Sequence, residues 1–284
     1  MVTRFDADRA VRRLKADKAK WCARPSNAAP SPAIRQMMKK NLNKGDLARA
    51  AANLDMETDW YAERGCQAVL DNEPVGWALL DRVLTNRWWH YRISVKGQFA
   101  SKVALGMAHA ITFHEDSIAD GLAERLLTSI DSESYGIIGW DLSRVAPFLI
   151  KLWCTWRDHP TSERLNTTSN LGVYGEIFEA WENDAQLGDA VAAACDRHLS
   201  DALLILSGEG YPDFLGPYDL FPVEILALNR IRRELGMAIP VVEHPLLSTP
   251  LALPPPADSR PKTTPDPVLD EFVAKARKLD GSFA

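Results

Sequence analysis

The sequence predicts an all-α protein: an array of about ten packed, mostly antiparallel helices with a Pro-rich C-terminal tail. Two observations support this fold class. Apolar residues recur three and four positions apart along most of the chain, which is the period of a helix with one buried face. Strand-like alternation of β-branched and aromatic residues occurs only weakly, at YRISV (91–95) and AIPVVEH (238–244). We therefore expect less than about 10% strand, far below the globular average.

The composition is that of an ordinary globular protein. Of the 284 residues, 46% are hydrophobic and 25% are charged. A chain of this length can bury a large core, so its stability requires no disulfide or metal. The nine tryptophans suit the gaps between packed helices, and no regular repeat period is present.

The first clear helices lie in the middle of the chain. The segment 73–92 has Pro74 near its first turn, where proline is favoured. The segment 114–130 begins with acidic residues, which the helix dipole favours at that end. The expected buried stripes are Trp77, Leu80, Leu84 and Trp88 in the first segment, and Ile118, Leu122, Leu126 and Ile130 in the second.

Three further helices follow. In SRVAPFLIKLWCTW (143–156), Pro147 indicates either a helix start or a kink, and we favour a start. The helix in 186–208 should end at Gly208. In 216–237, Asp219 is the expected cap, Pro222 the first turn and Gly236 the stop. The expected buried stripe of the helix in 186–208 is Val191, Cys195, His198, Ala202 and Ile205. The expected buried stripe of the helix in 216–237 is Ile225, Leu228, Ile231 and Leu235.

The C-terminal region changes character. Residues 245–267 contain eight prolines, which indicates an extended surface segment or linker. The residues after it predict a short amphipathic helix, which either docks on the body or frays, with Val268, Leu269, Phe272, Ala276 and Leu279 on its apolar face. These changes suggest three parts: a basic N-terminal helical arm, an all-helical main domain, and a Pro-rich segment with its helix, at 1–29, 30–245 and 246–284.

Charge is distributed unevenly along the chain. Residues 1–49 hold 13 Lys and Arg against 4 Asp and Glu, a net +9, whereas the remaining residues hold 20 against 34, a net −14. An acidic body argues against direct binding of nucleic acid over the main surface. It suits a basic protein partner, because complementary charge accelerates encounter. The alternative is that the negative charge only maintains solubility.

The sequence also predicts a cytoplasmic location. The four cysteines are isolated from one another, which fits unpaired thiols in a reducing compartment. The N-terminus lacks the apolar core of a secretory signal. No apolar stretch is long enough to span a membrane, so we expect no membrane association.

The sequence contains one cluster that resembles a chemical site: His109, His114, Glu115 and Asp116. It suggests a metal-dependent hydrolase of the all-helical His-Asp type. However, two histidines five positions apart do not share a helix face, and an acidic helix N-terminus explains Glu115 and Asp116 without metal. Nucleophile-elbow and phosphate-loop motifs are missing. We expect no catalytic residue, no cofactor and no metal, and we expect His198 to be a hydrogen-bonded core histidine.

A second cluster, in YGEIFEAWENDAQLGDA (174–190), combines carboxylates with aromatic residues and contains no Lys or Arg. Such a combination is typical of hot spots in protein interfaces. The alternative is a solvated helix face and loop. The predicted partner-binding residues are Glu179, Trp181, Glu182, Asp184 and Asp189.

Three segments resemble the all-α immunity proteins of bacterial polymorphic toxin systems, which have a Trp-containing helical core. They are NRWWHYRISVKGQFASKVALGMAHAITF (86–113), LGDAVAAACDRHLSDALLI (187–205) and YDLFPVEILALNRIRRELGMAIPVVEHPLL (218–247). The resemblance covers roughly residues 40–250. It implies an inhibitor that binds a cognate cytosol-acting toxin and blocks its active site or substrate access. A basic nuclease or nucleic-acid deaminase is the favoured toxin. The alternative, besides the hydrolase, is a helical scaffold or adaptor that recruits partners through its Pro-rich tail.

Overall fold

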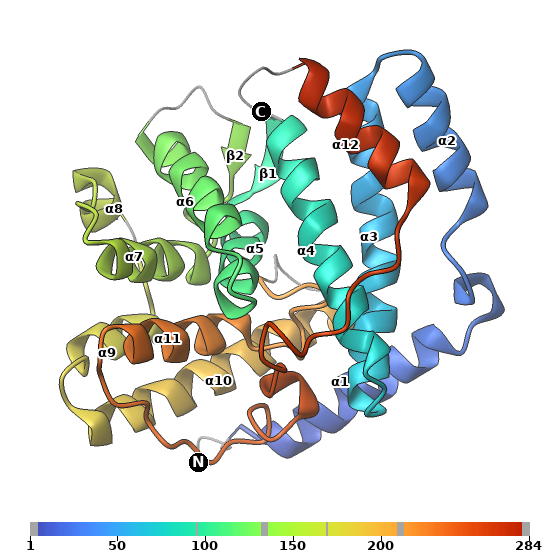
Figure 1. Cartoon of the computed structure of the whole chain (residues 1–284). Helices are drawn as coiled ribbons and strands as arrows, with labels where there is room; N and C mark the ends of the chain where they lie inside the picture. The colour runs from blue at the N-terminus through green and yellow to red at the C-terminus, as the bar shows by residue number, and fades with distance from the viewer. Residues whose placement is uncertain (1–4, 95, 132–135, 169, 209–212, 280–284) are drawn as a thin grey trace. The chain divides into compact units, whose positions relative to one another are not determined.

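The structure, a computed structural model, describes residues 5–94, 96–131, 136–168, 170–208 and 213–279. Within these residues it contains twelve α-helices and two short strands (Figure 1), which confirms the all-α prediction. The contacts group the chain into two compact units. The first unit comprises 1–16 and 96–254, and the second comprises 17–95 and 255–284. The division at residues 29 and 245, which was based on composition, stays a prediction.

In the second unit, two long helices form a hairpin on which other helices pack. Helix α3 (Leu47–Leu70) packs along α4 (Val75–Ile93), and α2 (Pro32–Asn43) packs on α3. The hairpin is tight because two glycines face each other across it: a Cβ on Gly76 would lie only 2.7 Å from the carbonyl oxygen of Gly65. Helix α1 (Ala7–Cys22) contains the boundary between the units, and the short η1 (Pro25–Asn27) follows it.

The C-terminal helix α12 (Pro267–Leu279) docks on this unit and does not fray (Figure 1). Its apolar face joins one buried cluster with residues of α2, α3 and α4. Phe272 and Ala276 are fully buried there, together with Met38 and Trp89. The expected stripe is therefore confirmed, except for the side chain of Leu279, which lies outside the described residues.

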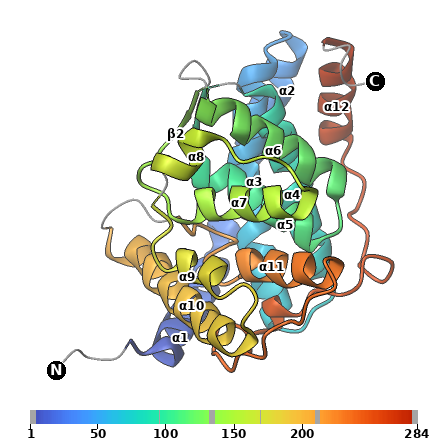
Figure 2. The ribbon, with the colours of Figure 1, turned by 90° about the vertical axis from the view of Figure 1, so that its left-hand side faces the viewer.

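In the first unit, α5 (Ala100–Thr112) is the central helix. It contacts α6 (Asp116–Asp131), α7 (Val145–Arg157) and α11 (Val223–Glu234), and every one of its described residues except Lys102 is buried. Ala, Gly and Ser make up much of α5, so neighbouring helices can approach its backbone closely. The remaining elements of the unit, several of which face the viewer in Figure 2, are α8 (Glu163–Thr168), α9 (Tyr174–Glu179), α10 (Asp184–Ser207) and η2 (Pro250–Ala252).

The strands do not form where the sequence suggested. Strand β1 (Lys96–Phe99) follows YRISV and pairs in parallel with β2 (Gly136–Ile138), a segment in which no strand was predicted. Residues 238–244 form no strand. Pro240 in that segment lacks the N–H that a ladder needs.

Helix ends were predicted well in α7 and less well in α11. Helix α7 begins two residues before Pro147, so that proline lies in the first turn as expected. Helix α11 begins after Pro222, so the prediction that Asp219 caps it was wrong. Leu235, expected to be buried, is 41% exposed because it follows the last helical residue. Gly236 then adopts φ 72° and ends the segment as expected.

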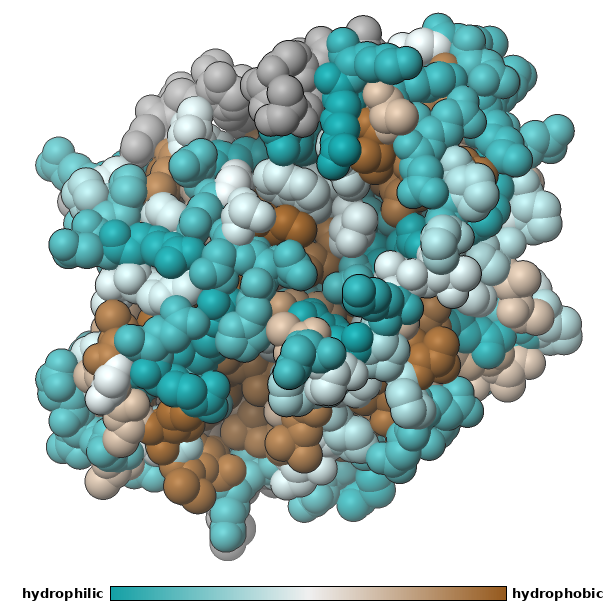
Figure 3. Space-filling view, in the orientation of Figure 1, coloured by the Kyte–Doolittle hydropathy of each residue, from teal (hydrophilic) through white to brown (hydrophobic). Residues whose placement is uncertain are grey.

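None of the helices in the described part of the chain has both the length and the apolarity needed to cross a membrane. Hydrophilic side chains cover much of the face drawn in Figure 3, with apolar side chains between them.

Candidate functional site

The predicted partner-binding residues lie at the junction of α9 and α10 in the first unit. The side chain of Asn183 caps α10 by accepting a hydrogen bond from the amide of Gln186 at 3.2 Å, which explains why the helix begins there. The four carboxylates, which we call the acidic surface, are all exposed: Glu179, Glu182, Asp184 and Asp189. They follow one another from the end of α9 into the second turn of α10.

One member of the acidic surface has a structural partner that the sequence did not reveal. Asp184 pairs with Arg232 of α11 at 3.1 Å, and the Arg232 side chain is only 1% exposed. The same guanidinium donates hydrogen bonds to the carbonyl oxygens of Trp181 at 2.7 Å and Ala238 at 2.8 Å. Asp184 therefore helps to hold the junction in place, and the other three carboxylates have no ion-pair partner among the described residues.

The aromatic residues of the cluster lead inward. Trp181 stacks on Phe178 with ring centroids 5.9 Å apart, and Phe178 lies 5.7 Å from Phe148. Phe148 in turn stacks on the buried ring of Tyr174 at 4.8 Å. Trp181 is half-buried, and the Arg232 guanidinium lies 5.1 Å from its ring. These four rings pack beneath the acidic surface, toward the core. Phe178 and Trp181 are partly exposed, whereas Phe148 and Tyr174 are buried.

The four residues of the suggested metal site do not converge on one point. His109 is fully buried in α5, with Nδ1 3.3 Å from the Tyr218 hydroxyl and its ring edge-on to Phe113. His114 is exposed at φ 60° in the turn before α6. No group of three or more His, Cys, Asp or Glu within the described ranges could hold a metal ion.

Asp116, the last member of that cluster, belongs to an ion-pair network at the start of α6. It pairs with Arg230 at 2.6 Å and with Arg157 at 3.4 Å. Arg230 also donates to the carbonyl oxygen of Ile111 and to Glu234, and its guanidinium lies 5.0 Å from the Trp156 ring. The network ties α6, α7 and α11 together, which accounts for Asp116 without a metal.

The Asp116→Asn variant is expected to lose less of its free energy of unfolding than the wild type when the pH is lowered. Burial acts to raise the pKa of Asp116, but hydrogen bonds and charges from Arg230 and Arg157 outweigh it and lower the pKa below its ordinary value of 3.8. A carboxylate with a lowered folded pKa stabilises the fold above its ordinary value, and this stabilisation is lost as the pH falls through the lowered value. Urea unfolding between about pH 5 and about pH 2.5 should therefore give a shallower decline for the variant.

The matched control for this measurement is Asp189→Asn, which removes an exposed carboxylate without an ion pair in the described structure. The free energy of unfolding of this control should fall with pH as steeply as that of the wild type. If it falls equally steeply in both variants, the assigned role of Asp116 is contradicted.

His198 is the core histidine that the sequence predicts. Its Nδ1 lies 2.7 Å from Glu224, its Nε2 lies 3.3 Å from the carbonyl oxygen of Asp219, and its ring stacks on Phe214 at 3.9 Å. Neither His198 nor Glu224 has any exposed surface. A pair closed off in this way holds α10 against α11 and offers no access to a substrate.

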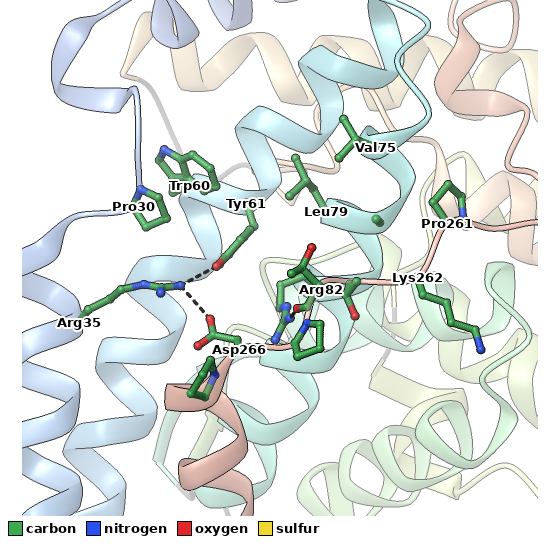
Figure 4. A pocket seen from close by; sticks show the side chains of 15 residues that line it. Pro30, Arg35, Trp60, Tyr61, Val75, Leu79, Arg82, Pro261, Lys262 and Asp266 are labelled. Carbon is green, nitrogen blue, oxygen red and sulfur yellow. Dashed lines mark hydrogen bonds and ion pairs between the residues drawn. The ribbon is translucent and has the colours of Figure 1, made fainter.

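The structure also contains a pocket that no feature of the sequence indicated. It lies in the second unit and has a volume of about 540 Å³ (Figure 4). Four segments line it: Pro30 with Arg35, Trp60 with Tyr61, one face of α4 with Val75, Ala78, Leu79 and Arg82, and the Pro-rich stretch 261–267. Because these segments are far apart in the chain, no local pattern could have revealed the pocket.

In the pocket wall, Arg35 joins its own helix α2 to α3 and to Asp266, the residue before α12. It pairs with Glu57 at 2.5 Å and with Asp266 at 2.8 Å, and it donates a hydrogen bond to the Tyr61 hydroxyl at 2.8 Å. Burial, and after it the charge of the nearby Glu57, raises the pKa of Tyr61 to about 12. Arg35 is therefore paired with two carboxylates and a hydroxyl group of the protein itself.

The two units differ in charge. The first holds 16 Lys and Arg against 24 Asp and Glu, a net −8, whereas the second holds 17 against 14, a net +3. The acidic surface thus belongs to the acidic unit, and the pocket belongs to the basic unit.

No protein-family model, curated protein or solved structure matches this chain.

Proposed function

We propose that the protein is an immunity protein that binds and neutralises a cognate bacterial toxin through the acidic surface of its first unit. The observation that carries the proposal is the exposure of Glu179, Glu182 and Asp189 without ion-pair partners among the described residues. They lie in a unit of net charge −8, which favours a basic toxin such as a nuclease or nucleic-acid deaminase. Binding there would block the toxin's active site or its substrate's approach.

We place this activity in the cytoplasm. All four cysteines are free thiols, and Cys66, Cys154 and Cys195 are buried. Unpaired thiols are stable in a reducing compartment, where nucleic acid and the translation machinery would be the toxin's targets.

The proposed function is tested by co-expression with the product of the adjacent gene. If that product arrests growth, co-expression of the full chain should restore growth, and the two proteins should co-purify as a complex. A harmless neighbouring product, or arrest that the chain does not relieve, would count against an immunity role.

Reversal of two carboxylates, Glu179→Lys with Glu182→Lys, is expected to weaken toxin binding at least about tenfold. Close charge pairs in an interface are each worth about 1.5–7 kcal/mol, so losing even one accounts for this factor. Both side chains are exposed and lack ion-pair partners among the described residues, so the melting temperature should stay nearly constant. Calorimetry at low and high salt measures the effect, which should diminish as salt screens the charges.

A matched control is Glu124→Lys with Glu243→Lys. Both residues are exposed in the same unit, so the change in net charge is equal. The control should bind almost normally. If the two double variants bind equally well, the acidic surface is only a solvated face. Asp184 is left intact in this design because its reversal would bring two cations together at Arg232.

A further inference from the structure

The pocket of the second unit has the proportions of a small-molecule site. Its volume of about 540 Å³ lies within the range of about 300–1,000 Å³ that is usual for such sites. Val75, Ala78 and Leu79 form an apolar wall on α4, and the Trp60 ring stands opposite on α3 (Figure 4). An apolar wall with an aromatic ring and a few polar groups is what a bound organic molecule requires.

The Pro-rich stretch 261–267 forms the third wall and is already fixed in place. One carboxylate oxygen of Asp266 accepts a hydrogen bond from Arg35 at 2.8 Å. The other accepts a hydrogen bond from the backbone amide of Val268, at the start of α12, at 3.0 Å. Arg82 donates a hydrogen bond to the carbonyl oxygen of Thr264. Because proline has a fixed φ, this wall loses little conformational freedom when a ligand binds.

Arg82 is the group that points to the chemistry of a ligand. It is only 8% exposed, and it lines the pocket. A guanidinium has five N–H donors, yet the described residues supply it with one hydrogen-bond acceptor, the carbonyl oxygen of Thr264. A buried cation is costly unless an anion and further hydrogen bonds compensate it.

The surrounding charges meet this requirement only in part, because no described carboxylate forms an ion pair with Arg82. Arg35 is neutralised by Glu57 and Asp266, so it contributes no free positive charge. Lys262 adds a second cation at an exposed position of the rim. Asp81, the residue before Arg82, is close enough to interact with both Arg260 and Arg82, but it lies outside the pocket lining, and its nearest described cationic nitrogen belongs to Arg260 at 3.9 Å. The pocket is therefore cationic on the side of Arg82 and Lys262 and apolar on the side of Trp60 and Leu79.

We propose that this pocket binds a small organic anion, a carboxylate or a phosphate monoester, whose anionic group pairs with Arg82 and whose apolar or aromatic body lies between Trp60 and Leu79. The planar fork of a guanidinium matches both anions through two parallel hydrogen bonds. This site is in the other unit from the acidic surface and does not depend on the proposed toxin.

The proposal is tested on the full chain with three probes of similar size: 3-phenylpropionate, phenyl phosphate and the neutral 3-phenyl-1-propanol. Saturation-transfer NMR and calorimetry measure their binding. At least one anion should bind about tenfold more tightly than the alcohol, and the better of the two distinguishes a carboxylate from a phosphate ligand. Equal binding of all three, or no binding of either anion, would overturn the proposal.

Three variants locate the site. Arg82→Met removes the cation and should abolish the preference for an anion. Val75→Trp fills the apolar side from a half-exposed position at the start of α4, so it keeps the fold and Arg82 while reducing binding of the preferred anion about tenfold. Arg49→Met, a highly exposed arginine of the same unit outside the pocket, should bind like the wild type. If Val75→Trp binds the anion unchanged, the pocket is not the site, even if Arg82→Met fails to fold.

Discussion

Phe272→Ala is expected to lower the free energy of unfolding of the second unit by about 3–5 kcal/mol. Phe272 is fully buried on α12, in the cluster that also contains Met38, Leu54 and Trp89. Removing a buried ring loses its transfer free energy and leaves a cavity that the surrounding helices fill only in part. Urea unfolding followed by tryptophan fluorescence measures the change, because Trp89 reports on the same cluster.

The control for this prediction is Lys278→Ala, an exposed position on the same helix, which should change stability by less than about 0.5 kcal/mol. A Phe272→Ala variant as stable as this control would show that α12 is only loosely attached. The expected result also bears on the adaptor hypothesis. A chain cut near residue 250 would lose α12 and part of the core, so its loss of activity would not reveal a recruiting tail.

Much of the fold could be predicted from the sequence because its helices have clear apolar stripes and marked ends. The fully buried residues Leu122, Val191 and Phe272 all lie on predicted stripes. The start of α7 followed from the fixed geometry of Pro147. Both signals are local, so one sequence suffices to read them. The strands were misplaced because a two-stranded pairing of three or four residues depends on tertiary context more than on local propensity.

The roles of the arginines in α11 could not be predicted. Arginines near the C-terminal end of a helix are locally explained by the helix dipole alone. In the structure, Arg230 and Arg232 are buried and pair with Asp116 and Asp184, which precede them by 114 and 48 residues. Interactions over such separations leave no local pattern.

The candidate site shows the same limit. The exposure of Glu179, Glu182 and Asp189 was foreseen from an acidic run without cations. The assumption that every carboxylate there is unbalanced was wrong for Asp184, because its cation comes from α11. The pocket around Arg82 was not foreseen at all, since it is assembled from residues between 30 and 267.

His198→Leu is expected to destabilise the first unit by about 3–5 kcal/mol, the cost of breaking a buried pair by removing one partner. His198 and Glu224 are both fully buried, and their 2.7 Å contact links α10 to α11. The change leaves the Glu224 carboxyl group inside the core without its hydrogen bond to His198. The exposed His159 provides the matched control, and His159→Leu should cost less than about 0.5 kcal/mol.

The double variant His198→Leu with Glu224→Leu distinguishes a coupled pair from two independent core positions. Each single change leaves one polar group buried without its partner, whereas the double change removes both groups together. The double variant should therefore lose less stability than the sum of the two single losses, with a coupling energy of about 0.5–3 kcal/mol from the complete cycle. Strict additivity in urea unfolding would contradict the pairing and would assign the cost of each change to lost packing, such as the stacking of His198 on Phe214. Because the acidic surface extends into the first two turns of the same α10, a coupled pair would also mean that part of this surface lies on a helix anchored in the core.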